Sequence, residues 1–118
     1  MIAVIFEAWP HEAQYQRYLD LASELKPLLE ELEGFISVER FQSLSDPGKV
    51  VSLSFWRDEA AIQHWRGLEQ HRAAQSAGRT AVFNGYRLRI AQVLRDYSLE
   101  DRAQAPSDSK HVHQSPAD

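Results

Sequence analysis

The sequence predicts an α+β fold in which two helices and four strands follow one another in the order β-α-β-β-α-β. Four segments carry apolar residues at every second position, a pattern typical of strands. Two others carry them at every third and fourth position, which is typical of helices with one buried face. A chain of 118 residues has the length of one domain, so all six elements are expected to share one core.

The first strand is expected over residues 2–8 and is apolar on both faces. Ile2, Val4 and Phe6 fall on one face, Ala3 and Ile5 on the other. Such a strand needs cover on both sides. The stripe of the first helix begins at Tyr15, and Gly34 is expected to stop the chain from continuing as a helix. Pro27 removes one backbone hydrogen bond, so we expect a kink or a split near Leu25.

A β-hairpin follows, with strands over residues 35–42 and 50–56. Val51, Leu53 and Phe55 share one face of its second strand. The two strands are joined by Ser45-Asp46-Pro47-Gly48, a turn in which Pro47 presets φ and Gly48 permits a positive φ. Strands joined in this way are expected to pair antiparallel.

The second helix is expected to begin at Asp58, whose carboxylate can cap it. Its inward residues are Ala61, Ile62 and Trp65. We expect Gly67 to break this helix, because glycine is a weak helix former. A second short helical turn is then predicted over residues 68–77, ending at Gly78.

The last strand is predicted over residues 82–93, and its apolar residues change sides along its length. Tyr86, Leu88 and Ile90 share one face, whereas Ala91 and Val93 lie on the other. A change of this kind requires either a β-bulge or a new partner that buries the opposite face.

The order β-α-β-β-α-β is that of the ferredoxin-like fold, with a four-stranded antiparallel sheet. Two helices can cover only one face of this sheet. Burying the apolar residues of the other face is worth ~25 cal/mol per Å², which favours a symmetric homodimer that pairs sheet against sheet. The domain is expected to span residues 1–97. Residues 98–118 contain almost no apolar side chains and are expected to form a disordered tail.

Composition excludes several classes of function. A net charge of −4 and a pI near 5.7 argue against nucleic acid as a partner, since phosphate binding needs a basic face. There is no cysteine for a disulfide or a thiolate site, and no His, Asp and Glu cluster at the spacing of metal ligands. No stretch approaches the ~18 apolar residues of a membrane helix, and no basic leader opens the chain, so we expect a cytoplasmic protein without a membrane partner.

The stretch from Phe55 to Tyr97 resembles a known family. Its successive features are the strand end Phe55-Trp56, a helix with Trp65, the residues His71, Gln75 and Arg79, and a long closing strand. This order is similar to that of the antibiotic biosynthesis monooxygenase family, which includes quinone-forming oxygenases and haem-degrading enzymes. The resemblance implies a dimeric α+β barrel in which the C-terminal strand is exchanged between subunits.

The haem-degrading branch implies one possible site. In that branch a tryptophan on this helix lines the cofactor pocket, and Trp65 occupies the matching position. Core packing explains an inward tryptophan equally well. The proximal histidine of the branch lies ten residues after the tryptophan, where this chain has Gln75. An asparagine near the end of the first strand is replaced by Glu7. Two of the three positions therefore differ from the haem pattern.

The quinone-forming branch implies another site, in which dioxygen oxidises an electron-rich phenol with no bound cofactor. The absence of dinucleotide, Walker and nucleophile-elbow motifs agrees with such chemistry. It requires a dry apolar pocket, a base and a hydrogen-bond donor. His71 is the expected base, because histidine titrates near neutral pH, and Trp65 is expected beside it.

We therefore expect a cofactor-independent monooxygenase that acts on a small aromatic or polyketide-like molecule between sheet and helices. The pocket is expected to be lined by Phe6, Phe55, Trp65 and Phe83. Substrate contacts are expected from Glu7, Phe55, Gln75, Phe83 and Tyr86. Two alternatives stay open, namely a haem-binding or haem-degrading protein and a non-catalytic dimer that binds a small molecule.

Overall fold

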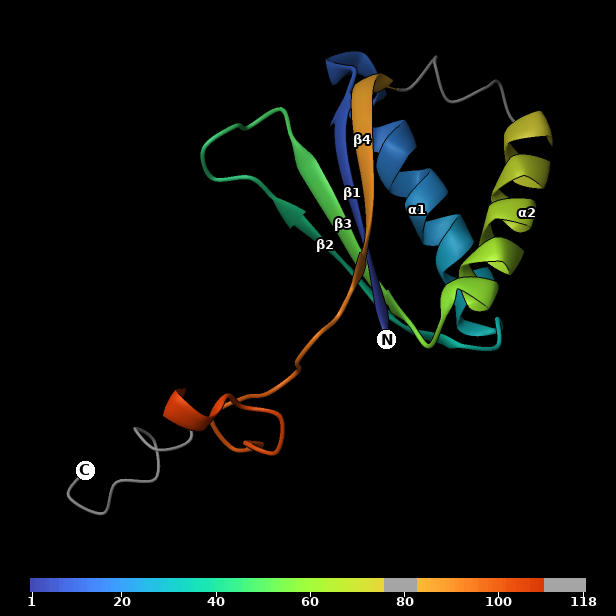
Figure 1. Cartoon of the computed structure of the whole chain (residues 1–118). Helices are drawn as coiled ribbons and strands as arrows, with labels where there is room; N and C mark the ends of the chain where they lie inside the picture. Colours follow the sequence, from blue (N-terminus) through green and yellow to red (C-terminus); the bar gives the residue numbers. More distant parts are fainter. Residues whose placement is uncertain (76–82, 110–118) are drawn as a thin grey trace.

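The computed structural model describes residues 1–75 and 83–109, and for residues 68–75 it describes the backbone alone. In chain order its elements are β1 (Ile2–Pro10), the 3-10 helix η1 (Glu12–Gln14), α1 (Tyr15–Glu30), β2 (Phe35–Gln42), β3 (Val50–Trp56), α2 (Glu59–Gln75) and β4 (Phe83–Gln92). The strands form one antiparallel sheet in the order β2-β3-β1-β4 (Figure 1). The predicted α+β ferredoxin-like fold is confirmed, and β2 and β3 have the expected bounds.

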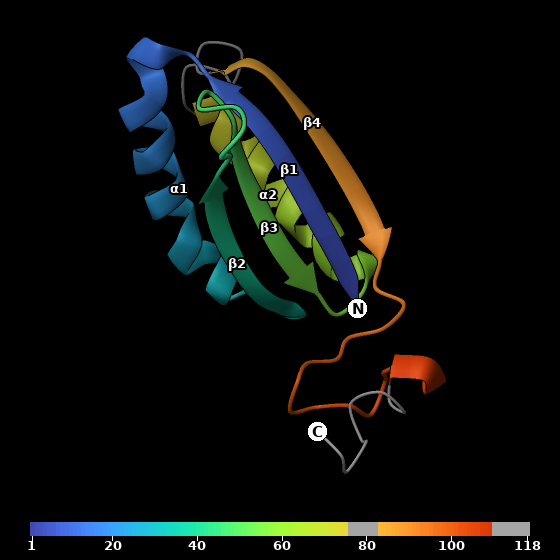
Figure 2. The ribbon, with the colours of Figure 1, turned by 90° about the vertical axis from the view of Figure 1, so that its left-hand side faces the viewer.

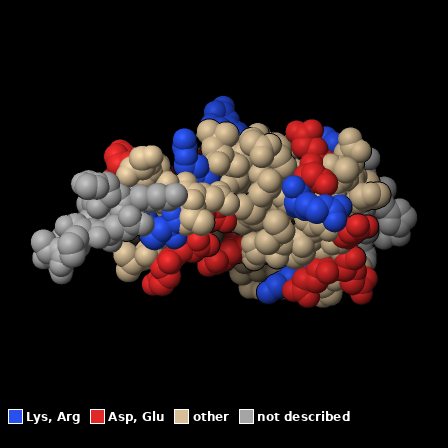
Figure 3. All heavy atoms as spheres, turned by 60° about the horizontal axis from the view of Figure 1, so that its bottom comes forward, with Lys and Arg blue, Asp and Glu red and all other residues tan. Residues whose placement is uncertain are grey.

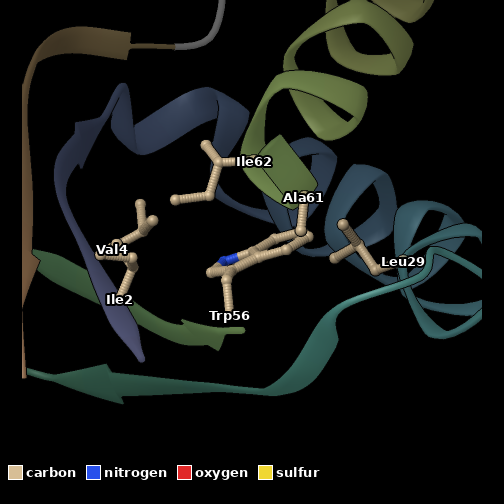
Figure 4. Close-up of a cluster of buried hydrophobic side chains, with 6 residues drawn as sticks. All are labelled: Ile2, Val4, Leu29, Trp56, Ala61 and Ile62. Atoms are coloured by element: carbon tan, nitrogen blue, oxygen red, sulfur yellow. The ribbon is translucent and has the colours of Figure 1, made fainter. Parts of the chain in front are cut away.

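Both helices lie on the same side of the sheet (Figures 1 and 2), and we call this side the helix face and the other side the open face. The main core lies between the helix face and the helices (Figure 4). Its buried members are Ile2, Val4, Leu29, Trp56, Ala61 and Ile62. Trp56 stands at its centre and is 2% exposed. The even-numbered positions of β1 therefore belong to the helix face, because side chains alternate along a strand.

The open face carries the odd-numbered residues of β1 and of β3. Ala3 is paired with Phe55, Ile5 with Leu53, and Glu7 with Val51. Directly opposed residues in an antiparallel pair share a face, so these six side chains lie together on the open face. Apart from Glu7 they are all apolar. The two apolar faces predicted for the first strand are therefore both present, and the described helices cover one of them.

Helix α1 passes through Pro27 without interruption, so the split expected near Leu25 is not found. A proline in a helix leaves one carbonyl without its usual partner, yet the turn beyond it is held to the sheet by Leu29, which is buried in the core. The loop after α1 contains Gly34 at φ +88°, as expected for a glycine that reverses the chain after a helix.

Helix α2 also runs on through Gly67, and the predicted break there is wrong. A glycine inside a helix costs about 1 kcal/mol relative to alanine. The capped start of α2, together with the burial of Ala61 and Ile62 against the sheet, outweighs a cost of this size. The short helical turn predicted from residue 68 is thus the second half of α2 as far as Gln75. Its predicted end, Gly78, lies outside the described residues, as does Arg79.

Strand β4 pairs with β1 in one unbroken register from Gln92, opposite Ile2, to Gly85, opposite Trp9. The bulge considered near Ile90 is therefore absent from this pairing. The register instead shifts at the other end, between Trp9 and Pro10. Val82, the predicted first residue of the strand, lies outside the described residues.

The backbone N–H of Val93 donates a hydrogen bond to the carbonyl of Met1. Beyond this bond the chain leaves the domain (Figure 1). Residues 96–109 form contacts among themselves, for example between the guanidinium of Arg102 and the ring of Tyr97. Leu94 and Leu99 are exposed. The predicted division into a domain over residues 1–97 and a disordered tail over residues 98–118 stays a prediction.

Charged side chains of both signs lie next to one another on the face of the molecule drawn in Figure 3. Among the ion pairs of the described residues, Glu33 and Asp58 both pair with Arg57, which precedes α2. Within residues 1–75 and 83–109, no helix combines the length and the apolar composition needed to cross a membrane.

We predict that replacing Gly34 destabilises the domain. Its φ of +88° is unfavourable for any other residue, and an added Cβ would lie 2.6 Å from the Cβ of Ala61. Gly34→Ala is expected to lower the free energy of unfolding by at least about 1–2 kcal/mol in chemical denaturation. Gly67→Ala is the control, because a methyl group inside α2 would meet nothing within 4 Å and should raise stability. Equal losses in both variants would contradict the strain assigned to Gly34.

We predict a pH-dependent contribution from the cap of α2. Asp58 accepts a hydrogen bond from the backbone N–H of Ala61 at 3.0 Å and another from Arg57 Nε at 3.1 Å. These bonds hold the pKa of the Asp58 carboxyl below its ordinary value of 3.8. A group with a lowered pKa stabilises the fold at higher pH, and this stabilisation is lost as the pH falls through the folded-state pKa.

Asp58→Asn keeps an acceptor at the cap but removes the charge. Its melting temperature is expected to lie below that of the unmodified protein at neutral pH. The gap should close as the pH falls below 3.8, where the carboxyl is protonated in the unfolded chain. Circular-dichroism melts over a pH series measure this gap, and a gap independent of pH would show that the carboxylate charge contributes nothing.

Candidate functional site

Four aromatic side chains meet on the helix face. Phe6 of β1 contacts both Phe83 and Tyr86 of β4, with ring centroids 5.8 and 5.6 Å away. The ring of Tyr18 on α1 contacts Phe83 edge to face at 5.6 Å. We call Phe6, Tyr18, Phe83 and Tyr86 the aromatic cluster. Aromatic pairs at such distances and tilts attract one another beyond simple burial of area.

The shift in register between β1 and β4 places Phe83 in this cluster. Tyr86 is opposite Ala8 and therefore lies on the helix face, as Phe6 does. Strict alternation from Tyr86 would direct Asn84 to the helix face and Phe83 to the open face. Because the register shifts after Trp9, Phe83 is instead opposite Pro10 and contacts the other helix-face aromatics.

The helix face remains partly uncovered along β4. Tyr86, Leu88 and Ile90 all belong to this face, yet they are 56%, 44% and 43% exposed. Helix α2 packs on the sheet near its beginning, through Ala61 and Ile62, and its C-terminal end stands away from the sheet (Figure 1). The described residues thus leave an accessible apolar surface that adjoins the aromatic cluster.

Two buried polar atoms under α1 have no hydrogen-bond partner among the described residues, namely Oη of Tyr18 and Nε of Arg40. Tyr18 is only 6% exposed. Burial raises the pKa of the Tyr18 phenol, and the nearby charge of Arg40 offsets part of this rise. Arg40 is on β2 opposite Ser52 of β3, which is itself opposite Phe6, so all three residues share the helix face.

Trp65 packs against the main core. Its ring contacts that of Trp56 edge to face, with centroids 6.3 Å apart, and it is half-buried. Among the ring pairs of the described residues, the pair with Trp56 is the one that includes Trp65. His71 and Gln75 lie on the second half of α2, and their side chains are outside the described part of the structure.

Glu7 and Phe55 lie on the open face, which corrects their expected place in one pocket with Phe6 and Trp65. Glu7 follows Phe6 directly and must point to the other side of the sheet. Its carboxylate pairs with Lys49 Nζ at 2.6 Å and with the guanidinium of Arg89. The hydrogen bond from Lys49 is the main reason why the pKa of Glu7 lies below its ordinary value.

The structure thus brings together three of the predicted residues, Phe6, Phe83 and Tyr86. It adds two that sequence reasoning passed over, Tyr18 and Arg40. Tyr18 fitted the apolar stripe of the first helix and carried no further signal. A single arginine in a strand is also unremarkable until the strand register shows which face it occupies. In residues 1–75 and 83–109, no group of three or more histidine or acidic side chains is placed to hold a metal ion.

Known proteins provide a comparison for this arrangement. One relative is the jasmonate monooxygenase ABM of Pyricularia oryzae, 47% identical over 93 residues. The match covers 79% of this chain and 43% of that protein, so the chain spans less than half the length of this relative. The uncharacterized protein YqjZ of Bacillus subtilis is 32% identical over 99 residues, which cover 84% of each chain.

The crystal structure of SnoaB, a cofactor-independent oxygenase from Streptomyces nogalater, superposes with a TM-score of 0.65. The superposition covers 80% of this chain and 94% of that one, at 12% identity, and it shows a shared fold. The family model for antibiotic biosynthesis monooxygenase matches residues 1–77. This match spans well over half of the sequence and includes β1, both helices and the hairpin. The chain belongs to the antibiotic biosynthesis monooxygenase family.

Proposed function

We propose that this protein is a monooxygenase that oxidises a small cyclic ketone or phenol on the helix face. The observation that carries the proposal is the aromatic cluster beside the exposed apolar side chains of β4. Phe6, Phe83 and Tyr86 offer flat apolar surfaces to a ring, and the Tyr86 hydroxyl can donate a hydrogen bond to a ring oxygen. The jasmonate monooxygenase relative supports a small cyclic substrate, since jasmonate is a small cyclopentanone acid.

The proposed reaction converts an activated CH₂ group into a carbonyl group. A base removes one proton from a carbon that adjoins a carbonyl or an aromatic ring, and the resulting carbanion reduces dioxygen. One oxygen atom becomes the new carbonyl oxygen and the other leaves as water, which takes both hydrogens of the CH₂ group. The substrate supplies all four electrons, so R₂CH₂ and O₂ give R₂CO and H₂O without an external reductant.

His71 is the proposed base for this step. Its imidazole titrates near neutral pH in the absence of perturbation, which suits proton abstraction from a weakly acidic carbon. Trp65 and Gln75 lie on the same helix and are proposed to contact the substrate from the α2 side. The exposed apolar side chains of β4 give up water when an apolar ring covers them, which favours binding of the ring.

Haem degradation has weaker support in this chain. The three positions of the haem pattern are Glu7, Trp65 and Gln75. Glu7 is paired with Lys49 on the open face, away from the helices. A hemin titration tests this alternative independently of turnover, through the Soret band of the bound form.

We predict that His71→Ala lowers oxygen uptake by about a hundredfold or more, the size typical for a lost general base. The assay follows dioxygen with an electrode while an anthrone or a cyclic ketone acid is supplied. His64→Ala is the control, because His64 is an exposed histidine of the same helix. Equal activity in both variants would remove His71 from the mechanism. If the unmodified protein takes up no oxygen with any such substrate, the proposed activity is contradicted, and a non-catalytic binding protein is the alternative.

We also propose that the chain forms a homodimer through the open face. The paired residues Ile5 and Leu53 lie at the middle of that face, and Ala3 and Phe55 lie beside them. A face with this composition, uncovered by the described helices, gains free energy when a second copy buries it. The segment after β4 extends away from its own domain with Leu94 exposed, which supports contact with a second copy.

We predict that light scattering at micromolar concentration gives about twice 13.5 kDa. Leu53→Glu should shift the protein toward monomer, because it places a charge at the centre of the open face. Leu44→Glu is the matched control, since Leu44 is fully exposed in the hairpin between β2 and β3. A monomeric unmodified protein, or equal dissociation by both variants, would contradict the proposed interface.

A further inference from the structure

Oη of Tyr18 and Nε of Arg40 have no hydrogen-bond partner within residues 1–75 and 83–109, which is unusual because buried polar groups in folded proteins nearly always find a partner. A donor that gives up water without a replacement lowers stability. Tyr18 could be a phenylalanine with the same ring contacts to Phe83, and packing alone gives no reason for its hydroxyl. A ligand that accepts hydrogen bonds at this point would account for the hydroxyl.

The position of the pair relative to the aromatic cluster fits a ligand that reaches both. Tyr18 belongs to the cluster through its ring, while its hydroxyl is close enough to Arg40 for the guanidinium charge to act on it. Arg40 and Phe6 stand in one row across the sheet, separated by Ser52 of β3. Neighbouring strands are about 4.8 Å apart, so the row from β2 to β1 is roughly 10 Å long. Because the side chain of Ser52 at the middle of this row is small, little side-chain bulk stands on the helix face between the polar pair and Phe6.

The pair can donate several hydrogen bonds, although the phenol oxygen of Tyr18 can also accept one. A guanidinium has five N–H groups and no acceptor, and a neutral phenol donates one O–H. No carboxylate among the described residues forms an ion pair with Arg40, in contrast to Arg57 and Arg89. A carboxylate is the group whose planar pair of oxygens a guanidinium binds best, with charge-assisted hydrogen bonds.

We propose that Tyr18 and Arg40 bind the carboxylate of the substrate, which identifies the substrate class as small cyclic acids. This inference rests on the proposed function, which places the ring of the substrate on the aromatic cluster. The acid group lies under α1 against the hydroxyl of Tyr18 and the guanidinium of Arg40. The ring then lies over Phe6, Phe83 and Tyr86, where the CH₂ group to be oxidised is carried. The site therefore selects acids over neutral molecules of the same shape.

The test compares acids with their methyl esters, which keep the ring and lose the charge. The probes are jasmonic acid with methyl jasmonate and 1-naphthylacetic acid with its methyl ester, titrated into the full chain by calorimetry. The unmodified protein is expected to bind at least one acid about tenfold to a hundredfold more tightly than its ester, the range for hydrogen bonds to a charged group. Equal affinities for acid and ester, or no binding of either acid, would overturn the inference.

Two variants assign the discrimination to the pair. Tyr18→Phe and Arg40→Gln are each expected to weaken binding of the acid by about tenfold or more and to leave binding of the ester unchanged. Their matched controls are Tyr15→Phe, another tyrosine of α1, and Arg17→Gln, an exposed arginine of the same helix. Unchanged acid binding in both test variants would show that the acid is held elsewhere.

A stability measurement separates binding from folding. Without ligand, Tyr18→Phe should melt at the same temperature as the unmodified protein or above it, because it removes an unpaired buried hydroxyl. A clear fall would show that the hydroxyl supports the fold, and would overturn the inference.

Oxygen uptake then distinguishes the two proposals. Selective binding of acids without uptake supports the acid site and removes the monooxygenase activity. Uptake with the acids at the same rate in Tyr18→Phe and Arg40→Gln as in the unmodified protein supports the monooxygenase activity and removes the acid site.

Discussion

The pairing of β1 with both β3 and β4 determines on which face of the sheet each strand residue of the candidate site lies. β1 is central in the sheet, so its register with each neighbour decides which residues stand together on the helix face and which on the open face. Phe6 opposes Ser52 on one side and Leu88 on the other, and the row extends to Arg40 on β2. Because side chains alternate, a change of one position in either pairing would exchange the two faces.

The two faces carry different chemistry as a result. The helix face carries the aromatic cluster together with two polar atoms, Oη of Tyr18 and Nε of Arg40, that have no hydrogen-bond partner among the described residues. On the open face, the one carboxylate of the β1 segment, Glu7, is neutralised by Lys49 and Arg89 within an apolar surrounding. Ionic groups that are paired within the chain are suited to burial at an interface, whereas donors without a partner are suited to a ligand. The separation is consistent with the proposed dimer interface on the open face and the proposed ligand site on the helix face.

Local sequence patterns predicted the helices and strands well, and they failed where the structure depends on contacts between one element and another. The hairpin strands agree with alternation and with the turn around Pro47 because both signals are local. The continuity of α2 through Gly67 depends on burial of its first turns, which a glycine alone does not reveal. The aromatic composition of the site was visible in the sequence. The placement of Phe6 and Phe55 on opposite faces of the sheet was not visible in the sequence, because it follows from the register in which β1 pairs with β3.

The shift in register between Trp9 and Pro10 makes the lining of the site adjustable without a change of fold. From Gly85 to Gln92, beyond the shift, β4 follows strict alternation, and the shift alone decides that a phenyl ring rather than the amide of Asn84 faces the helices. Loss of a single residue at this point would exchange the two, while the core around Trp56 at the opposite end of β1 would keep its packing. Relatives that share the scaffold can thus acquire a polar or an apolar site through a one-residue insertion or deletion, a route to new substrates that leaves the core around Trp56 untouched.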